Sequence, residues 1–525
     1  MRLLSAVAVT LLTEASHAAF YYPNVQTSLL EHILVDNWGA YASNFSSAIT
    51  PCTNYVTQTG TAALNSGRTT AAQWMRVLFH DFITANVSAG TGGVDASIGF
   101  ETARGENSGS AFNDSFTFWR PFVNDVVSMA DLVALGTAMS NNLCGGENLP
   151  YHAGRMDAAS AGVTTGVPAP ETDLEETLVF FERAGFDKVD AIGLTACGHT
   201  MGSVHHGGFP DVVDETAVTP TNTNGGSNFD TTRGIFDPNV VGEYVHWTGN
   251  RGGPLVTTSN ETTRSDLRLY ESDSNVTMRA LFAQGNNFLK TCVDLMGRAM
   301  NTVPSGVKLS APISAIPLKP VNVTFDFDDS GSLKLSGKIR VLSSAGESAP
   351  STLSIQVANH TSSLVPEPST GTSVFGRKGD TYGLTTYFPF SLSGAEISTA
   401  KSFSIAAPNT PSQSFDIRSG IFVVPGLTTL LGSALNATIA ILPQYTCQDI
   451  TLRVAAPIPQ PGTLAPTIRI IQSSLTEALK APEGYSLCFV SETLDSIPTG
   501  MVTIEVLREA QVADTYLVNG GAAGW

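Results

Sequence analysis

The pattern of apolar residues changes near Pro304, and this change restricts the fold more than any other feature of the chain. Before it, apolar residues recur at the three- and four-residue spacing of helices in ranges 71–82, 116–140, 173–184 and 276–300. After it, short alternating runs follow, such as 321–327, 332–342, 402–406 and 501–507. We therefore expect a mainly helical domain over residues 19–304 and a β-rich, sandwich-like region of one or two modules over residues 305–525.

The N-terminus has the pattern of a signal peptide over residues 1–18. Arg2 supplies a positive charge, residues 3–12 are apolar but too few to span a bilayer, and Ser16-His17-Ala18 is a small-residue cleavage site. We expect a secreted, extracellular protein whose mature chain begins near Ala19. Eight glycosylation sequons support this expectation, at Asn44, Asn86, Asn113, Asn260, Asn275, Asn322, Asn359 and Asn436.

The charge of the chain limits its partners. A net charge of -18 and a pI near 4.8 would repel nucleic acids and anionic membranes, so neither is expected as a partner. After the N-terminus, no run of eighteen apolar residues occurs.

The six cysteines are too few for a disulfide-dense scaffold, but an oxidising compartment favours some pairing. We predict the pairs Cys52 with Cys144 and Cys447 with Cys488. Cys197 and Cys292 are the candidates for free thiols.

Two segments that each contain a histidine are candidates for a catalytic or ligand-binding site. In residues 76–81 (RVLFHD), Arg76 and His80 are four apart, so a helix places both side chains on one face toward one small ligand. In residues 195–200 (TACGHT), His199 ends another apolar helix, and its small neighbours would admit a flat ring. Taken singly, each is more often a histidine of an ordinary protein core.

Taken together, with their order and separation, the two segments resemble the distal and proximal signatures of the plant, fungal and bacterial peroxidase superfamily, in its secreted fungal branch. The resemblance covers residues 21–300. It implies haem b held through His199, with Arg76, His80 and the neighbouring Phe79 on the opposite side. It also implies an enzyme that reduces hydrogen peroxide and oxidises small phenolic or aromatic amine donors in one-electron steps.

Two oxygen-rich segments strengthen the resemblance, because each follows one of the histidines and implies one of two Ca²⁺ ions. The implied distal ligands are Asp81, Gly93, Asp95 and Ser97. The implied proximal ligands are Thr200, Asp230, Thr232, the carbonyl of Ile235, and Asp237.

Supporting residues are also implied by the resemblance. Asn107, itself held by Glu101, would accept the second ring N–H of His80 and keep that base neutral. Phe229 would lie near His199. A carboxylate on His199 would increase its electron donation to iron; Asp273 is the preferred candidate and Asp266 the second.

The chain differs from two groups of enzymes within this family. Manganese-oxidising members carry acidic residues where this chain has Thr69, Gln73 and His205, so a manganese site is not expected. Members that oxidise bulky substrates through a surface tryptophan carry it where this chain has Leu194. Small donors oxidised at the haem edge remain the expectation.

Two other functions fit parts of the sequence. His199, His205 and His206 could serve a non-haem metal enzyme, although adjacent histidines point in different directions. Alternatively, the helical half is a non-catalytic peroxidase fold in a surface or carbohydrate-binding protein, with the C-terminal region attached to a polymer or cell wall.

Overall fold

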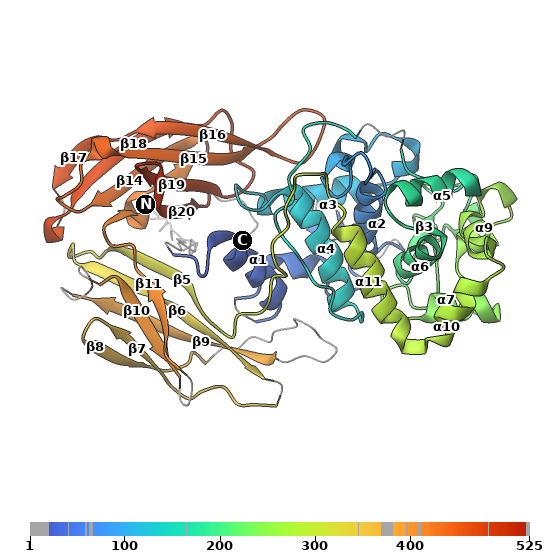
Figure 1. Ribbon diagram of the computed structural model, residues 1–525, viewed down its shortest axis with the longest axis horizontal. Coiled ribbons are helices and arrows are strands. Elements are labelled where there is room, and N and C mark those ends of the chain that lie inside the picture. Colours follow the sequence, from blue (N-terminus) through green and yellow to red (C-terminus); the bar gives the residue numbers. More distant parts are fainter. Residues whose placement is uncertain are drawn as a thin grey trace, which may run out of the picture.

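The computed structural model describes residues 20–520 apart from 40, 58–59, 62–66, 163–165, 345, 369–381, 395–396, 398–399, 408–410 and 481. The predicted signal peptide lies outside the described residues. Helices occupy one end of the molecule and β-sheets the other (Figure 1). This arrangement confirms the predicted fold class of a mainly helical part followed by a β-rich part.

The helical half is built from α-helices joined by long loops. In chain order they are α1 (Val25–Val35), α2 (Thr70–Phe82), α3 (Ala111–Trp119), α4 (Met129–Leu143), α5 (Leu174–Arg183), α6 (Lys188–Gly198), α7 (Asn239–His246), α8 (Pro254–Thr257), α9 (Ser265–Glu271), α10 (Val276–Ala283) and α11 (Phe288–Met300). Two short antiparallel pairs accompany them: β1 (Val56–Thr57) with β2 (Gly60–Thr61), and β3 (Ser203–His205) with β4 (Gly226–Asn228). Within the described residues, no helix has the length and apolar character needed to cross a membrane.

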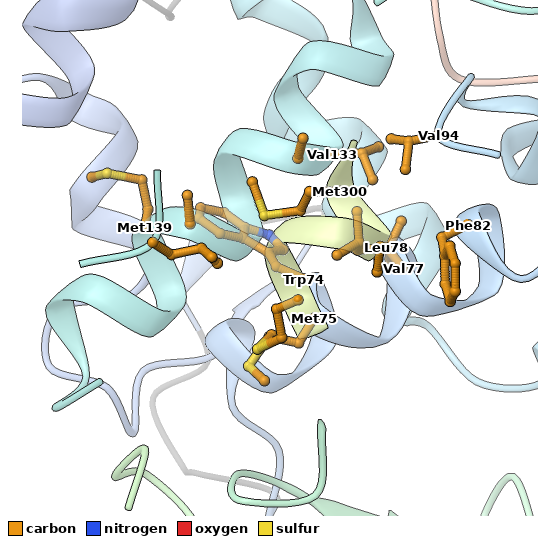
Figure 2. Packing of buried hydrophobic residues seen from close by; sticks show 14 of the residues in the cluster. Trp74, Met75, Val77, Leu78, Phe82, Val94, Val133, Met139 and Met300 are labelled. Atoms are coloured by element: carbon orange, nitrogen blue, oxygen red, sulfur yellow. The ribbon is translucent and has the colours of Figure 1, made fainter. Parts of the chain in front are cut away.

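The core of this half forms where α2 packs on α4. The apolar face of α2 buries Trp74, Val77 and Leu78 among residues of α4 and α11 (Figure 2). Gly136 of α4 makes the close approach possible, because a Cβ there would lie 2.8 Å from the Trp119 ring and 3.1 Å from the Trp74 ring. The opposite face of α2 is thereby left to carry Arg76 and His80.

The described residues of the β half form four antiparallel sheets. Their orders are β5-β6-β9, β11-β10-β7-β8, β12-β14-β18-β17 with β13 beside β14, and β16-β15-β19-β20. The bounds are β5 (Leu318–Phe327), β6 (Leu333–Ser344), β7 (Leu353–Val357), β8 (His360–Leu364), β9 (Tyr382–Ser393), β10 (Ser402–Ala406), β11 (Gln413–Asp416), β12 (Ile421–Val423), β13 (Thr429–Leu431), β14 (Ala434–Ile441), β15 (Ile450–Ile458), β16 (Thr467–Ser474), β17 (Thr476–Lys480), β18 (Ser486–Thr493), β19 (Val502–Arg508) and β20 (Gln511–Val518). The strands bury two separate apolar clusters, one around Phe388 and Phe403 and the other around Leu452 and Ile504.

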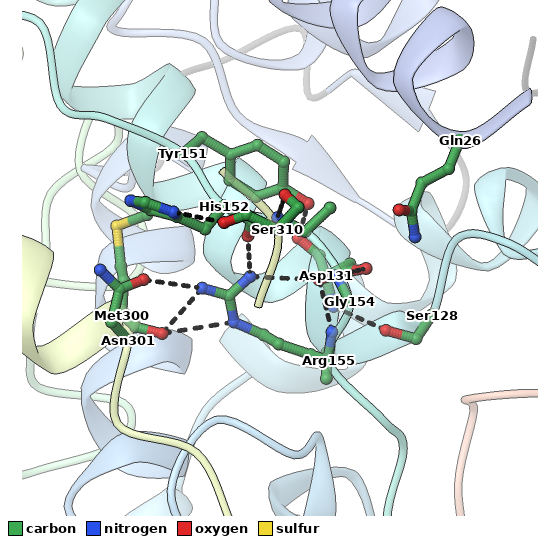
Figure 3. A network of polar contacts seen from close by, with 12 residues as sticks. Gln26, Ser128, Asp131, Tyr151, His152, Gly154, Arg155, Met300, Asn301 and Ser310 are labelled. Carbon is green, nitrogen blue, oxygen red and sulfur yellow. Dashed lines mark hydrogen bonds and ion pairs between the residues drawn. The ribbon is translucent and has the colours of Figure 1, made fainter. Parts of the chain in front are cut away.

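The segment that follows α11 is fixed to the helical half. The Arg155 guanidinium donates to the Met300 carbonyl at 2.8 Å and pairs with Asp131 at 3.1 Å (Figure 3). Farther along, the Ser310 and Ile313 N–H groups donate to the carbonyls of residues 153 and 151, each at 2.8 Å. The connection to the β half is therefore ordered by hydrogen bonds instead of being a free linker.

Buried charges join α1 to the first sheet. Lys319 of β5 contacts the Glu31 carboxylate at 2.7 Å, and Arg340 of β6 contacts Asp36 at 2.7 Å and also Glu31. Burial alone would raise the pKa of Asp36, but Arg340 and His32 hold it below its ordinary value. Removing one member would leave an unpaired buried charge, which commonly costs about 3–5 kcal/mol.

All six cysteines form disulfides. The predicted pairs Cys52–Cys144 and Cys447–Cys488 are confirmed. The interpretation of Cys197 and Cys292 as free thiols is wrong, because these two residues also pair. The packing of α6 on α11 places their Cα atoms 5.4 Å apart, within the range that a disulfide spans.

Candidate active site

Two helices place His80 and His199 on the walls of one cavity. His80 lies in the last turn of α2, and His199 is the residue at which α6 ends. The cavity is lined by Arg76, Phe79 and His80 on the α2 side and by His199 and Phe229, among others, on the α6 side. The two signature segments are thus brought together, as their resemblance implied.

His80 is held as a neutral base. Its Nδ1 lies 2.7 Å from the amide oxygen of Asn107, so Nδ1 carries the ring proton and donates it to that oxygen. Nε2 is therefore the unprotonated ring nitrogen, and its lone pair accepts a long hydrogen bond from the Arg76 Nε–H at 3.4 Å. Burial, and next the charge of Arg76, lower the pKa of His80 to about 3. The imidazole therefore stays able to accept a proton at neutral pH.

Arg76 is fixed beside His80 by backbone carbonyls. It donates to the Ser108 carbonyl at 3.1 Å and the Glu106 carbonyl at 2.9 Å. Its guanidinium carbon also lies 5.1 Å from the centre of the Phe112 ring. Burial, followed by the nearby Arg68, lowers its pKa to about 10, so Arg76 remains a cation at neutral pH.

Asn107 is supported by Glu101, but through the backbone. The Asn107 amide nitrogen donates to the Glu101 carbonyl at 2.9 Å. The Glu101 carboxylate instead accepts from the Gly162 N–H at 2.7 Å and pairs with Arg104 at 2.6 Å. Glu101 thus sets the orientation of Asn107 by the position of its main chain.

The carboxylate partner of His199 is Asp266. The His199 Nδ1 lies 2.7 Å from Asp266 Oδ2, and the Asp266 side chain is 4% exposed. The prediction of Asp273 for this role is wrong, because its carboxylate accepts the N–H groups of Val276 and Thr277 at the start of α10. Asp266 lies in the first turn of α9, which packs against α6, whereas Asp273 follows the end of α9.

An aromatic ring covers His199. The Phe229 ring stacks on the imidazole, with centroids 3.8 Å apart and planes inclined by 8°. Phe79 also lines the cavity, and its ring lies 5.9 Å from that of Phe181.

The loop after α2 gathers the predicted distal calcium ligands. Asp81 accepts N–H groups of residues 95, 96 and 98, and Asp95 accepts the Ser97 N–H at 3.0 Å. The Ser97 hydroxyl is buried and has no hydrogen-bond partner among the described residues. Burial, and then Asp95, raises the pKa of Asp81. Gly93, at a φ of 99°, lets this loop pass close to the Thr302 carbonyl, 2.5 Å from where a Cβ would lie. A cation would offset the buried acidity, so the donor set fits calcium.

The loop after α6 gathers most of the predicted proximal ligands. Asp230 is buried, with Oδ1 accepting the Thr232 N–H at 2.7 Å and Oδ2 lacking a partner within the described chain. Burial raises the pKa of Asp230 to about 7, and the charge of Asp237 adds to the rise. Thr200 is buried, whereas the Ile235 side chain is exposed and only its carbonyl would serve as a ligand.

Neither loop is a site of acidic side chains alone. Across the described ranges, no three His, Cys, Asp or Glu side chains gather closely enough to hold a metal. Calcium would therefore depend on hydroxyl and carbonyl oxygens as well. The same finding contradicts the interpretation of His199, His205 and His206 as a metal cluster.

One end of the cavity is polar, and this was not predicted from the sequence. Thr69, Gln73 and His205, which in the sequence only argued against a manganese site, line the cavity together with Arg68. Each presents a buried polar atom without a partner in the described part of the chain: Thr69 Oγ1, Gln73 Oε1, His205 Nε2 and Arg68 Nε. Buried polar atoms are normally paired, so this end of the cavity is built for a polar group. The signal in the sequence was the helical spacing of Thr69 and Gln73 with Arg76, whereas His205 lies on β3 and had no such signal.

Comparisons with known proteins agree with this geometry. Residues 56–285 match the family described as peroxidase. The chain is 38% identical over 317 residues to a WSC domain-containing protein of Arthroderma benhamiae, covering 59% of this chain and 42% of that protein. It is 31% identical over 170 residues to Peroxidase 22.3 of Oryza sativa subsp. japonica, covering 30% of this chain and 51% of that protein. It is 31% identical over 184 residues to Manganese peroxidase H4 of Phanerodontia chrysosporium, covering 33% and 44%. The chain thus spans about half, or less, of the length of these relatives.

Proposed function

The chain carries a domain of the peroxidase superfamily, and from this premise we propose that it is a secreted haem peroxidase. Its substrates would be hydrogen peroxide and small phenolic or aromatic amine donors. One observation carries the proposal: two imidazoles line one cavity, one kept neutral by burial and Arg76 and oriented by Asn107, the other backed by the Asp266 carboxylate.

The residues present fit haem. His199 donates its Nδ1 proton to Asp266, so its Nε2 is left to hold the iron. The polar end formed by Arg68, Thr69, Gln73 and His205 suits the carboxylates of haem b, which would pair its unpartnered buried atoms. When bound, haem supplies the redox chemistry, taking up two oxidising equivalents from hydrogen peroxide and passing them to donors singly.

Side chains of the protein transfer the proton of hydrogen peroxide. His80 Nε2 accepts a proton from hydrogen peroxide, because Asn107 holds the other ring nitrogen as the donor. The same nitrogen then returns the proton to the departing oxygen, which leaves as water. Arg76, held by two carbonyls, stabilises the negative charge that develops as the oxygen–oxygen bond breaks.

The cavity supports small organic donors over a metal cation. Thr69, Gln73 and His205 are neutral, and burial lowers the pKa of His205 to about 4, so these three residues offer a metal cation no carboxylate. Leu194 also occupies the position at which members that oxidise bulky substrates carry their surface tryptophan. Donors would therefore react where they reach the cavity directly.

Extracellular location is part of the proposal. Three disulfides support it, because such bonds persist in oxidising compartments. The sequon residues Asn44, Asn359 and Asn436 are exposed, as glycosylation requires. Attachment of the C-terminal region to a cell-wall polymer is a further part of the proposal; failure of the full chain to sediment with insoluble polysaccharide would remove it.

The test uses peroxide-dependent oxidation of a phenolic dye by the purified full chain. His80→Ala should lower kcat/KM for peroxide by about a hundredfold or more, since general acid–base catalysis contributes factors of 10²–10⁴. His206→Ala is the matched control, because His206 bonds the Val213 carbonyl and does not line the cavity. Equal activity of the His80 variant would refute the mechanism, and haem binding without any turnover would favour the non-catalytic surface protein.

A further inference from the structure

A loop of the β half packs on the helical half close to the active site. Residues 459–466 join β15 to β16 and extend toward the helices around α3 (Figure 1). Leu464 and Ala465 pack into the apolar core of the helical half, and Ala465 is 4% exposed. The loop is thus a fixed part of the helical domain's surface.

The loop contacts the short 3₁₀ helix η2 (Ser97–Phe100). A Cβ added to Gly99 would lie 2.5 Å from Thr463 Oγ1 and 2.6 Å from the Phe116 ring, so no side chain fits between them. A Cβ on Gly462 would lie 3.4 Å from the Phe100 ring, an ordinary contact distance. Thr463 is itself held, because its hydroxyl accepts the Ala465 N–H at 3.1 Å.

Short links connect η2 to the distal histidine. Glu101 directly follows η2, and its carbonyl accepts the Asn107 amide at 2.9 Å. Asn107 in turn accepts the His80 Nδ1 proton at 2.7 Å. The Ile98 N–H, within η2, donates to Asp81, the neighbour of His80, at 3.1 Å. A shift of η2 would therefore move the group that orients His80.

We infer that Thr463 is a positioning residue for the active site: pressed against Gly99, it fixes η2 and, through Glu101 and Asn107, the orientation of His80. This inference rests on the proposed function. It gives the C-terminal region a role in the reaction, since the helical half alone lacks the residue that closes this contact.

Removing the Thr463 side chain should leave the β half attached to the helical half, because other contacts join them. Arg453 of β15 pairs with Asp125 at 2.6 and 2.9 Å, and a Cβ on Gly500 would lie 2.4 Å from the Val123 carbonyl, which marks close backbone packing. These anchors lie outside η2. A change at Thr463 therefore tests positioning and not the attachment of the half-molecule.

The experiment compares Thr463→Ala with Thr463→Ser and Thr438→Ala in the full chain. Thr438 is the control because it is a buried β-region threonine whose hydroxyl donates to the Leu427 carbonyl within the β half. Thr463→Ala should lower kcat/KM for peroxide by about tenfold, because small misplacements of reacting groups cost up to about a hundredfold. The kcat/KM for the phenolic donor should not change. Thr463→Ser should restore the rate, and Thr438→Ala should leave it unaltered.

Hydrogen–deuterium exchange supplies a readout that needs neither haem nor turnover. Amides of residues 97–107 should exchange faster in Thr463→Ala and at the unmodified rate in Thr438→Ala. Unchanged exchange, or an equal fall in both kcat/KM values, would overturn the positioning role. Absence of peroxide turnover in the unmodified chain would instead refute the proposed function, and the exchange comparison would still decide whether Thr463 fixes η2.

Discussion

Replacing Asp266 by Asn is the sharpest perturbation of His199. The change keeps the shape of the side chain and removes its charge from a position that is 4% exposed and 2.7 Å from His199 Nδ1. A hydrogen bond to a charged group contributes about 1.5–3 kcal/mol, roughly twice a neutral one, so about 1–1.5 kcal/mol should be lost. Each 1.4 kcal/mol is about tenfold in an equilibrium constant, which predicts roughly tenfold weaker haem binding.

The assay is a haem titration of the full chain followed by visible absorbance, with competition by a haem-binding protein of known affinity. Asp273→Asn is the matched control. Its carboxylate accepts only from Val276 and Thr277 at the start of α10, and Asn keeps one oxygen acceptor there. The haem affinity of that variant should equal that of the unmodified chain. An equal loss in both variants, or a loss in Asp273→Asn alone, would refute the assignment of Asp266.

Three further predictions concern pH, calcium and the buried disulfide. The kcat/KM for peroxide should stay level from neutral pH down to about pH 4 and fall only near pH 3, because burial and Arg76 lower the pKa of His80 to about 3; a half-loss near pH 6.5 would contradict this. A calcium chelator should lower the melting temperature more at pH 8 than at pH 5. Burial raises the pKa of Asp230 to about 7, so the ionised carboxylate is disfavoured in the calcium-free fold. In differential scanning calorimetry, the calcium-free protein should therefore lose stability as the pH rises from 4 to 7. Replacing both cysteines of the Cys197–Cys292 pair by Ala should cost about 2–5 kcal/mol in urea denaturation and weaken haem binding, whereas replacing Cys447 and Cys488 should leave haem binding unchanged.

The sequence was sufficient where chemistry depends on spacing within one element. Arg76 and His80 are one helical turn apart, so any helix there presents both to the same cavity. The change from helical to alternating periodicity likewise predicted the two halves, because burial on one face imposes each period.

The incorrect predictions concern residues whose partners are set by the packing of separate helices. Asp266 and Asp273 both follow a serine within the same short stretch, and only the contact of α9 with α6 distinguishes them. The Cys197–Cys292 bond likewise depends on α6 lying beside α11. The contact between Thr463 and Gly99 joins residues 364 positions apart, which no local pattern can reveal.

Absorption spectroscopy of the haem-titrated full chain tests most directly whether the cavity between His80 and His199 binds haem. The unmodified chain should take up one haem with a strong Soret band that changes on addition of one equivalent of hydrogen peroxide. His199→Ala should lose the histidine-ligated spectrum, and His80→Ala should keep it but respond to peroxide at least a hundredfold more slowly. A chain that stays colourless with haem, or a His199 variant with an unchanged spectrum, would contradict the assignment of this cavity to haem.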